Sequence, residues 1–328
     1  MTNDAGAADG FDMLALYGKA AESAADDGGC RAFALHNETG EGTITIYRVL
    51  PGIRVVYNDL HMGYCHKKQE STAHVIEINH CREGRYECSI AHQTCCYLAP
   101  GDLALGALDQ PFTDSAFPTR HYHGISIYIE LERLPPALYD MMTLLSIDMA
   151  HISALLCNEN RFFIMRANES IAHIFSELYS IRETRKPGYL KIKVLELLLF
   201  LSDLSGADSF RRTEYLNRAH VQKIKRLHDF ILADLQRHYT IGELSARFQL
   251  SPTALKKDFA RVYGAPVYAY QRAYRLQSAQ KRLRCTDDSI AQIAAAVGYE
   301  NPNKFASAFK QVYGVSPTAF RNDVRLDR

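Results

Sequence analysis

The spacing of hydrophobic residues changes along the 328-residue chain. Between residues 43 and 130, short β-branched and aromatic runs such as TITIYRVL, IRVVY and GISIYIE are separated by turn pairs such as Pro51-Gly52 and Pro100-Gly101. Such punctuation predicts short strands in an antiparallel sandwich or barrel. Residues 131–204 follow a helical period instead, which predicts helices over 138–157, 170–181 and 189–204.

The two ends of this region have a different composition. Residues 1–42 are rich in Ala, Gly and Asp, and we expect a partly ordered extension with one helix around Phe11–Ser23. Residues 205–219 are polar and are the expected interdomain linker. The pattern is helical from residue 220 to near the end of the chain. The expected fold class is therefore α+β, with strands over 43–130 and helices over 131–204 in one domain and an all-α domain over 220–328.

The all-α domain contains an internal repeat with an offset of 50 residues. Each copy has a short helix, a turn and a second helix that ends at a glycine, Gly264 or Gly314. Ser251-Pro252 and Asn301-Pro302 place a capping side chain before a proline in the first turn of each second helix. The matched positions are Leu255, Phe259, Val262, Tyr263 and Gly264 with Phe305, Phe309, Val312, Tyr313 and Gly314.

Each copy is typical of a helix-turn-helix. A small residue follows the core leucine or isoleucine of each first helix, Ser245 in one copy and Ala294 in the other, where the two helices must approach closely. Gly298 stands at the turn of the second copy, whereas the first copy has Gln249 there. We expect the two units at about 240–264 and 289–314.

The helix that begins at Pro252 has two different faces. Leu255, Phe259 and Val262 point to one side, and Thr253, Lys256, Lys257 and Ala260 point to the other. A Thr/Lys/Lys stripe opposite a core stripe suits insertion into a major groove, although such a stripe alone also fits a solvated surface. The duplication and the turn residues favour the groove.

Charge is divided unevenly along the chain. The formal net charge is +1, but residues 218–328 hold 19 Lys and Arg against 9 Asp and Glu, a net of +10, and residues 1–217 hold 19 against 28, a net of −9. This distribution indicates an acidic body with a basic C-terminal third that can meet a polyanion. With 47% hydrophobic and 23% charged residues, the composition excludes a disordered chain.

Location and redox state also follow from the sequence. The longest apolar run is too short to span a bilayer, so no membrane partner is expected. The N-terminus lacks the layout of a signal peptide. We therefore expect a cytoplasmic protein whose 8 cysteines are thiols or metal ligands rather than disulfides.

Residues 220–322 resemble the DNA-binding domain of the AraC/XylS transcription regulators. The resemblance rests on "IGELSARFQLSPTALKKDFARVYG", "YRLQSAQKRL" and "SIAQIAAAVGYENPNKFASAFKQVYGVSPTAFR". It implies two helix-turn-helix subdomains joined by a long helix at about 267–284, bound to double-stranded DNA. Ser307 stands where the family often has a long Arg, so we expect base readout mainly from the first unit. The implied base or phosphate contacts are Thr253, Lys256, Lys257, Asn303, Lys304 and Ser307, with Arg272, Arg275, Lys281, Arg282, Lys304, Lys310 and Arg321 as candidates for contacts to the DNA backbone.

The resemblance also suggests a role for the first two-thirds of the chain. Many relatives carry a cupin-like antiparallel β barrel for a small effector, followed by helices for dimerisation, here 138–157 and 189–204. It implies a homodimer that activates transcription with RNA polymerase as a partner. The candidate effector-pocket residues, in "IEINHCREGRYEC" and "HYHGISIYIE", are His80, Arg82, Arg85, Tyr86, His121 and His123.

A metal or thiol site in the same segments is the main alternative. His121 and His123 share one side of a strand, and His80, Cys81 and Cys88 lie nearby in sequence, so an N/S cluster is conceivable. The cupin metal pattern needs a Glu four to five residues after His-x-His, and Ile and Tyr stand there. We therefore expect no cofactor and no enzyme activity. The alternatives left open are an effector-independent regulator and a metal- or thiol-dependent enzyme or sensor fused to the helix-turn-helix domain.

Overall fold

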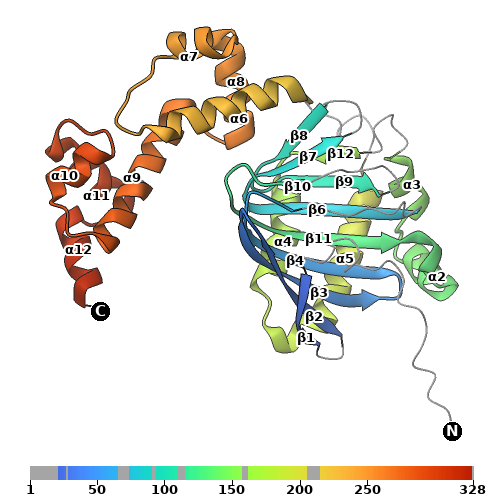
Figure 1. Cartoon of the computed structure of the whole chain (residues 1–328). Coiled ribbons are helices and arrows are strands. Elements are labelled where there is room, and N and C mark those ends of the chain that lie inside the picture. Colours follow the sequence, from blue (N-terminus) through green and yellow to red (C-terminus); the bar gives the residue numbers. More distant parts are fainter. Residues whose placement is uncertain are drawn as a thin grey trace. The chain divides into compact units, whose positions relative to one another are not determined.

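The computed structural model describes residues 21–26, 29–65, 74–90, 94–108, 115–156, 162–204 and 215–326. The chain divides into two units, Met1–Asn217 and Arg218–Arg328. The first combines antiparallel sheets with helices, and the second is built from helices (Figure 1). The predicted α+β class is confirmed.

A large antiparallel sheet forms the centre of the N-terminal unit. Strands β3 and β4 form a hairpin, and β11 lies between β4 and β6. The order across the sheet is β1 (Ala21–Asp26), β2 (Cys30–Asn37), β3 (Gly40–Leu50), β4 (Ile53–His61), β11 (Tyr122–Glu130), β6 (Val75–Gly84), β9 (Leu103–Ala107) and β12 (Phe162–Met165).

A smaller antiparallel sheet faces it. A shared core of buried residues, including Ile44, Val56 and Tyr122 from the large sheet and Tyr86 and Cys96 from the small one, joins the two. In the described residues the strands therefore pair into two sheets rather than into one closed sheet. The order in the smaller sheet is β13 (Leu216–Asn217), β8 (Thr94–Leu98), β7 (Tyr86–Ile90), β10 (Ser115–Ala116) and β5 (Tyr64–Cys65).

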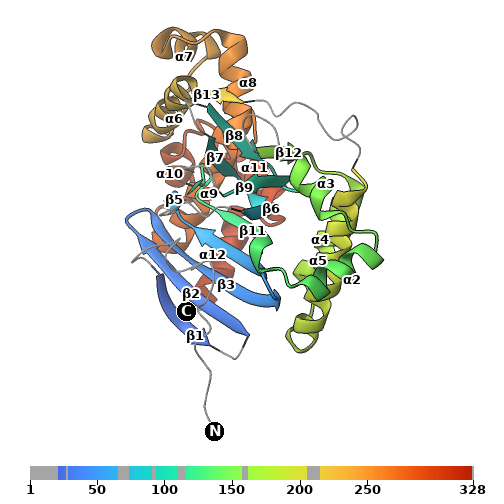
Figure 2. The ribbon, with the colours of Figure 1, turned by 90° about the vertical axis from the view of Figure 1, so that its right-hand side faces the viewer.

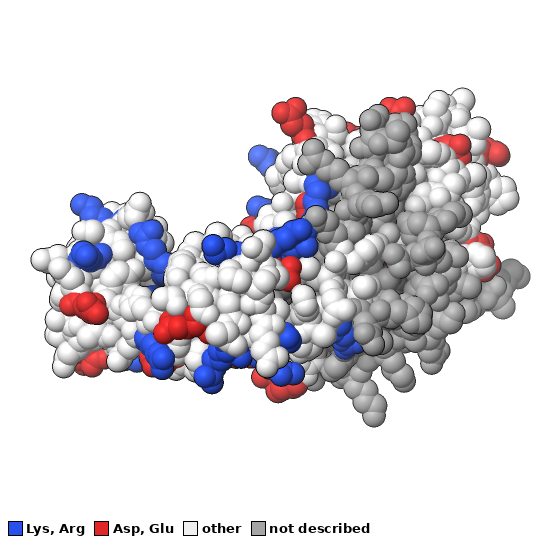
Figure 3. Space-filling view, turned by 90° about the horizontal axis from the view of Figure 1, so that it is seen from above, with Lys and Arg blue, Asp and Glu red and all other residues white. Residues whose placement is uncertain are grey.

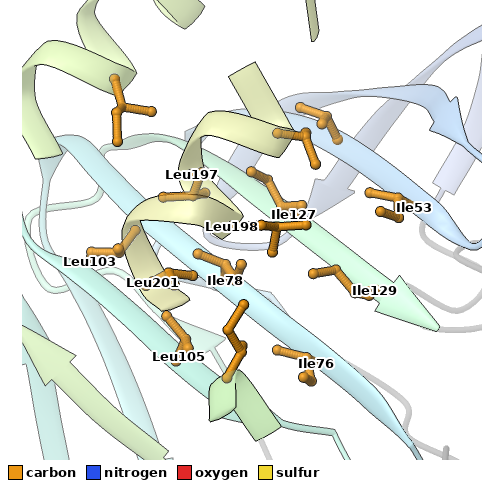
Figure 4. Packing of buried hydrophobic residues seen from close by; sticks show 14 of the residues in the cluster. Ile53, Ile76, Ile78, Leu103, Leu105, Ile127, Ile129, Leu197, Leu198 and Leu201 are labelled. Atoms are coloured by element: carbon orange, nitrogen blue, oxygen red, sulfur yellow. The ribbon is translucent and has the colours of Figure 1, made fainter. Parts of the chain in front are cut away.

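Helices cover the other face of the large sheet (Figures 1 and 2). Alternation along each strand supplies this second core, since successive side chains point to opposite faces. Figure 4 shows Leu197, Leu198 and Leu201 of α5 against isoleucines of β6 and β11. The helical elements are η2 (Leu131–Arg133), α2 (Pro136–Leu144), α3 (Met149–Ala154), α4 (Glu169–Ser180), η3 (Glu183–Arg185) and α5 (Lys186–Ser202).

The structure corrects four expectations about this unit. Strands β1 and β2 lie within the expected extension 1–42. The expected helix around Phe11–Ser23 lies outside the described residues as far as residue 20. From Ala21 the chain forms strand β1 instead of a helix. The predicted helix 138–157 is two helices, separated where Ser146 has φ +60°. Strand β12 interrupts the helical region because Phe162–Met165 pairs with β9. Part of the expected linker 205–219 is β13, and helix α6 begins at Arg218; residues 205–214 lie outside the described residues.

The C-terminal unit is a succession of short helices around one long helix, α9. Helices α7 and α8 pack with α6 and the start of α9, and α10, α11 and α12 pack around its other half. None of the helices in the described part of the chain is long and apolar enough to cross a membrane. The helices are α6 (Arg218–Ala233), α7 (Ile241–Phe248), α8 (Pro252–Tyr263), α9 (Val267–Cys285), α10 (Ile290–Ala296), α11 (Pro302–Tyr313) and α12 (Pro317–Leu326).

Candidate DNA-binding surface

Local capping fixes where the second helix of each repeat begins. The Ser251 side chain accepts a hydrogen bond from the backbone N–H of Ala254 at 3.2 Å, and proline occupies the first turn of α8. Asn301 does the same for α11, accepting from the N–H groups of Asn303 and Lys304. These bonds satisfy donors that a helix start leaves without partners. Both helices span 12 residues and end at a glycine in the left-handed conformation.

Helix α8 separates a buried face from an exposed one. Leu255, Phe259 and Val262 are fully buried, whereas the predicted contact residues Thr253, Lys256 and Lys257 are exposed. A helix that is anchored on one side and polar on the other can enter a groove without losing its packing. The three side chains therefore lie on one accessible face at the N-terminal half of α8.

Helix α11 has the same design with one difference. Phe305 and Phe309 are buried, and the predicted contact residues of this helix are exposed. Val312, which matches buried Val262 in the repeat, is 55% exposed. The reason is that α6 packs against α8, whereas α11 packs against α10 and α12. The exposed contact residues are Asn303, Lys304, Ser307 and Lys310.

The turns of the two units both contain a residue with positive φ, but the residue type differs. Gly298 has φ +82°, a conformation that glycine adopts without steric cost. Gln249, the departure from the repeat, also takes a left-handed conformation, with φ +51° and ψ +52°. Its carbonyl oxygen accepts a hydrogen bond from Lys223 of α6 at 3.1 Å. The first turn is therefore held by a contact from outside the motif.

Three of the predicted backbone contacts have partners inside the domain, and one of them is Arg282, whose Nη1 lies 3.7 Å from an Asp288 carboxylate oxygen. Arg272 is exposed, but its Nη2 donates to Oε1 of Gln311 on α11 at 2.6 Å. Arg275 is only 6% exposed, and its Nη2 donates to the carbonyl oxygen of Arg237 at 3.0 Å. The prediction that Arg275 contacts DNA is wrong, because burial keeps its guanidinium away from any phosphate.

Charge on this unit favours a polyanionic partner. Figure 3 shows Lys and Arg side chains at several places on one face of the C-terminal unit, with fewer Asp and Glu side chains among them. Together with the net charge of +10 of residues 218–328, this surface attracts a nucleic-acid backbone.

Known proteins share this part of the chain. Residues 244–323 match the family model described as a helix-turn-helix domain. The chain is 28% identical over 140 residues to the HTH-type transcriptional activator RhaR of Pectobacterium carotovorum. This match covers 43% of this chain and 49% of RhaR. It is 30% identical over 105 residues to the regulatory protein PocR of Salmonella typhimurium, which covers 32% of this chain and 35% of PocR. A solved transcriptional regulator of Chromobacterium violaceum, of the group with AraC-type DNA-binding domains, has 21% identity and a TM-score of 0.30, covering 33% of this chain and 96% of its own.

The chain spans about half or less of the length of these curated relatives. The duplicated motif, its caps and the family match define the C-terminal unit as a double helix-turn-helix domain. It is similar over this part of the chain to the transcription regulators RhaR and PocR.

The structure places the six candidate effector residues in different surroundings. His80, Arg82 and His123 gather around Tyr179 of α4, on the face that the helices cover. The His80 ring stacks on Phe175 with centroids 4.0 Å apart, and its Nδ1 lies 3.0 Å from the Tyr179 hydroxyl. The Arg82 guanidinium lies 4.7 Å from the centre of the Tyr179 ring, and His123 meets that ring edge-on.

The other three candidates have different neighbours, although the Glu83 carboxylate, 3.5 Å from Nε of Arg82, links His121 to this group. His121 stacks on His61 with centroids 5.0 Å apart, and its Nε2 lies 3.3 Å from a Glu83 carboxylate oxygen. Tyr86 faces the opposite way, into the core between the sheets. Burial lowers the pKa of Arg85, against the opposing effect of nearby Asp102. The six residues therefore do not form one pocket.

Thiol and metal chemistry gain no support from this geometry. Burial raises the pKa of Cys81 to about 12, which keeps this thiol protonated at neutral pH. Across the described ranges of the chain, no three His, Cys, Asp or Glu side chains stand close enough together to hold a metal ion.

Sequence reasoning missed a polar group inside the core between the sheets. The Tyr122 hydroxyl donates to Oδ1 of Asn79 at 2.6 Å, and Nδ2 of Asn58 donates to Oγ of Ser126 at 3.1 Å. All four residues are buried. A signal was present, because polar residues alternate with isoleucines in IEIN (76–79) and place polar side chains on the face opposite the helices.

Acidification is expected to destabilise the N-terminal unit through His80. Burial lowers its pKa from 6.5 to about 4, so the folded protein favours the neutral ring. The contribution of neutral His80 to the free energy of unfolding is therefore fully present above pH 6.5. It is lost as the pH falls to about 4, which lowers the free energy of unfolding by up to about 3 kcal/mol. Urea unfolding of the wild type and of His80→Phe, which keeps a ring on Phe175, measures this difference. Identical pH dependence of the two proteins would contradict it.

Proposed function

We propose that this protein is a sequence-specific, DNA-binding transcription regulator, and that it acts as an activator. The two capped helices with exposed Thr, Lys and Asn side chains on a basic unit carry the proposal. Each helix enters a major groove, and the two grooves lie about one helical turn (~34 Å) apart. Activation is suggested by RhaR, a relative named as a transcriptional activator, and we propose a contact with RNA polymerase along with it. The proposed location is the cytoplasm, and no enzymatic step is proposed.

Selection of bound sequences from random DNA tests this function. The full chain is incubated with a pool of random duplexes, and the retained duplexes are sequenced after several rounds. The expected result is a motif with two conserved blocks about one helical turn apart. Recovery of no enriched sequence contradicts the proposal.

The N-terminal unit is proposed to bind a small effector. A cavity of about 730 Å³ beside α4 and α5, lined by polar and apolar side chains that include Ser170, His173 and Phe200, supports such a site. A thermal-shift screen against small metabolites tests this, since a ligand that binds the folded state raises the Tm. An effector-independent regulator responds to none of them.

We propose further that two copies associate through the helices of the N-terminal unit. Leu144 at the end of α2 is 85% exposed, and Ile192 on α5 is 63% exposed. Large apolar side chains on one helical layer favour a protein partner over water. Two copies place four helix-turn-helix units on DNA and increase affinity through avidity. Sedimentation of the full chain measures the state of association.

Lys257 is expected to contribute more to DNA affinity than Ser307. On the duplex selected above, Lys257→Ala should weaken binding about 10- to 100-fold, because a contact to a base edge is worth ~1–3 kcal/mol. Ser307→Ala should weaken it less than about threefold, because the short hydroxyl reaches few groups. Fluorescence anisotropy titrations measure both. Equal losses for the two variants would show that the second unit reads bases as well.

A further inference from the structure

The connection that precedes α7 and the turn that precedes α11 meet beside the long helix α9. The connection between α6 and α7 belongs to the first subdomain and contains Leu235, Arg237 and His238. The turn between α10 and α11, in the second subdomain, contains Gly298. Arg275, near the middle of α9, lies between them. We refer to Arg237, His238, Arg275 and Gly298 as the α9 joint.

Side-chain hydrogen bonds within the α9 joint connect helix α9 to the first subdomain and the first subdomain to the second. The Arg275 guanidinium donates to the Arg237 carbonyl oxygen at 3.0 Å, and its Nη1 lies 3.3 Å from the His238 ring nitrogens. Nε2 of His238 lies 3.0 Å from the Gly298 carbonyl oxygen. His238 therefore connects the first subdomain directly to the turn that precedes recognition helix α11.

These partners determine the tautomer of His238. The Gly298 carbonyl can only accept a hydrogen bond, so Nε2 of His238 carries the hydrogen and donates it. Nδ1 is then the acceptor for Nη1 of Arg275. Both ring nitrogens are used, one toward each side of the joint, and no side chain without two such groups can replace this bridge.

Backbone contact sets the separation at the same point. A Cβ added at Gly298 would lie 2.2 Å from the carbonyl oxygen of Leu235 and 3.1 Å from Cζ of Arg275. Real Cβ atoms do not approach other atoms so closely, so any side chain at position 298 pushes the second turn away from the first subdomain. The contact and the hydrogen bonds define one distance between the subdomains.

We propose that the α9 joint is a spacer gauge, which sets the one separation of DNA half-sites that both recognition helices can occupy together. The proposal rests on the DNA-binding function proposed above. Linked modules gain avidity only when their geometry allows both to bind at once. His238 and Arg275 are thus positioning residues that act through α11, without touching DNA. Loosening the α9 joint should lower the affinity for DNA with the selected spacing of the two blocks. It should also make the affinities for duplexes with other spacings similar to this one.

The test compares three duplexes: the one selected by the full chain, and versions with one base pair inserted or deleted between its two blocks. Wild-type protein should lose about 10²-fold in affinity on the altered duplexes. His238→Ala should lose about tenfold on the selected duplex and differ less than about threefold among the three. His238 is exposed, so this change removes the bridge without opening the core. Gly298→Ala, which widens the joint instead, should also abolish the preference for the selected spacing.

Two control variants separate the gauge from other effects. Gln236→Ala changes an exposed side chain in the same connection and should keep the wild-type preference. Lys281→Ala removes an exposed cation from α9 and should weaken binding by one factor on all three duplexes. Thermal unfolding checks that each variant is folded, and if Gly298→Ala is not, His238→Ala alone decides. An unchanged spacing preference in folded His238→Ala overturns the gauge, whereas failure of the wild type to bind any duplex overturns the proposed function itself.

Discussion

Raising the salt concentration from about 50 to about 200 mM is expected to weaken binding of the full chain to its selected duplex by about 10³- to 10⁵-fold. The reason is counterion release: each phosphate neutralised by Lys or Arg releases condensed cations, and about 6–10 such contacts give this slope. The net charge of +10 on residues 218–328 can supply them, and the net of −9 on residues 1–217 repels DNA. Anisotropy titrations over a salt series measure the slope.

Single-residue variants test whether the salt dependence of DNA affinity arises from the C-terminal unit. Lys304→Ala removes an exposed cation at the start of α11 and should reduce the logarithmic slope by about one. Lys191→Ala removes an exposed cation from α5 of the N-terminal unit and should leave the slope unchanged. A flat salt response on a specifically bound duplex would contradict the proposed mode of binding.

Phe309→Ala is expected to lower the free energy of unfolding of the C-terminal unit by about 3–5 kcal/mol, because truncating a buried Phe removes its transfer free energy and leaves a cavity. Phe309 is fully buried, and its ring contacts those of Phe305, Tyr313 and Phe320, with centroids 5.8, 4.5 and 5.6 Å away. Since these rings come from α11 and α12, the loss should release recognition helix α11 from the second subdomain. Urea unfolding followed by circular dichroism measures the change.

Val312→Ala is the matched control on the same helix. Val312 is 55% exposed, so its truncation should change stability by less than about 0.5 kcal/mol. The repeat alone gives the opposite expectation, because its counterpart Val262 is fully buried. Equal losses for Phe309→Ala and Val312→Ala would show that α11 is covered on both faces.

Strand prediction in the N-terminal unit succeeded where local pattern was strong. Alternation in TITIYRVL, IRVVY and GISIYIE corresponds to β3, β4 and β11, whose side chains divide between the two cores. Strands β2 and β12 were not predicted from their own residues. Strand β12 pairs along its length with β9, which is distant in sequence, and β2 pairs with the adjacent strand β3, which has the strong pattern that β2 lacks. Strand pairing of this kind overrides local propensity.

The candidate effector residues show the same limit. The spacing of His121 and His123 places both on one side of a strand, but it says nothing about what lies opposite. Tyr179 contacts both His123 and His80, although it lies 99 residues after His80 in the sequence. His61 stacks on His121. These neighbours come from α4 and β4, so only folding brings them together.

The two helix-turn-helix units could be predicted without the structure, because their signals are local: a side chain caps the second helix of each unit, glycine ends it, and the helical period separates buried from exposed positions. Thr253, Lys256 and Lys257 are exposed as that period requires. Only the tertiary structure decided the role of Arg275. Its partners, Arg237 and His238, lie 38 and 37 residues away in sequence. Nothing in the helical pattern distinguishes an arginine on the solvent side of α9 from one that connects two subdomains, because that difference depends on contacts made across the chain.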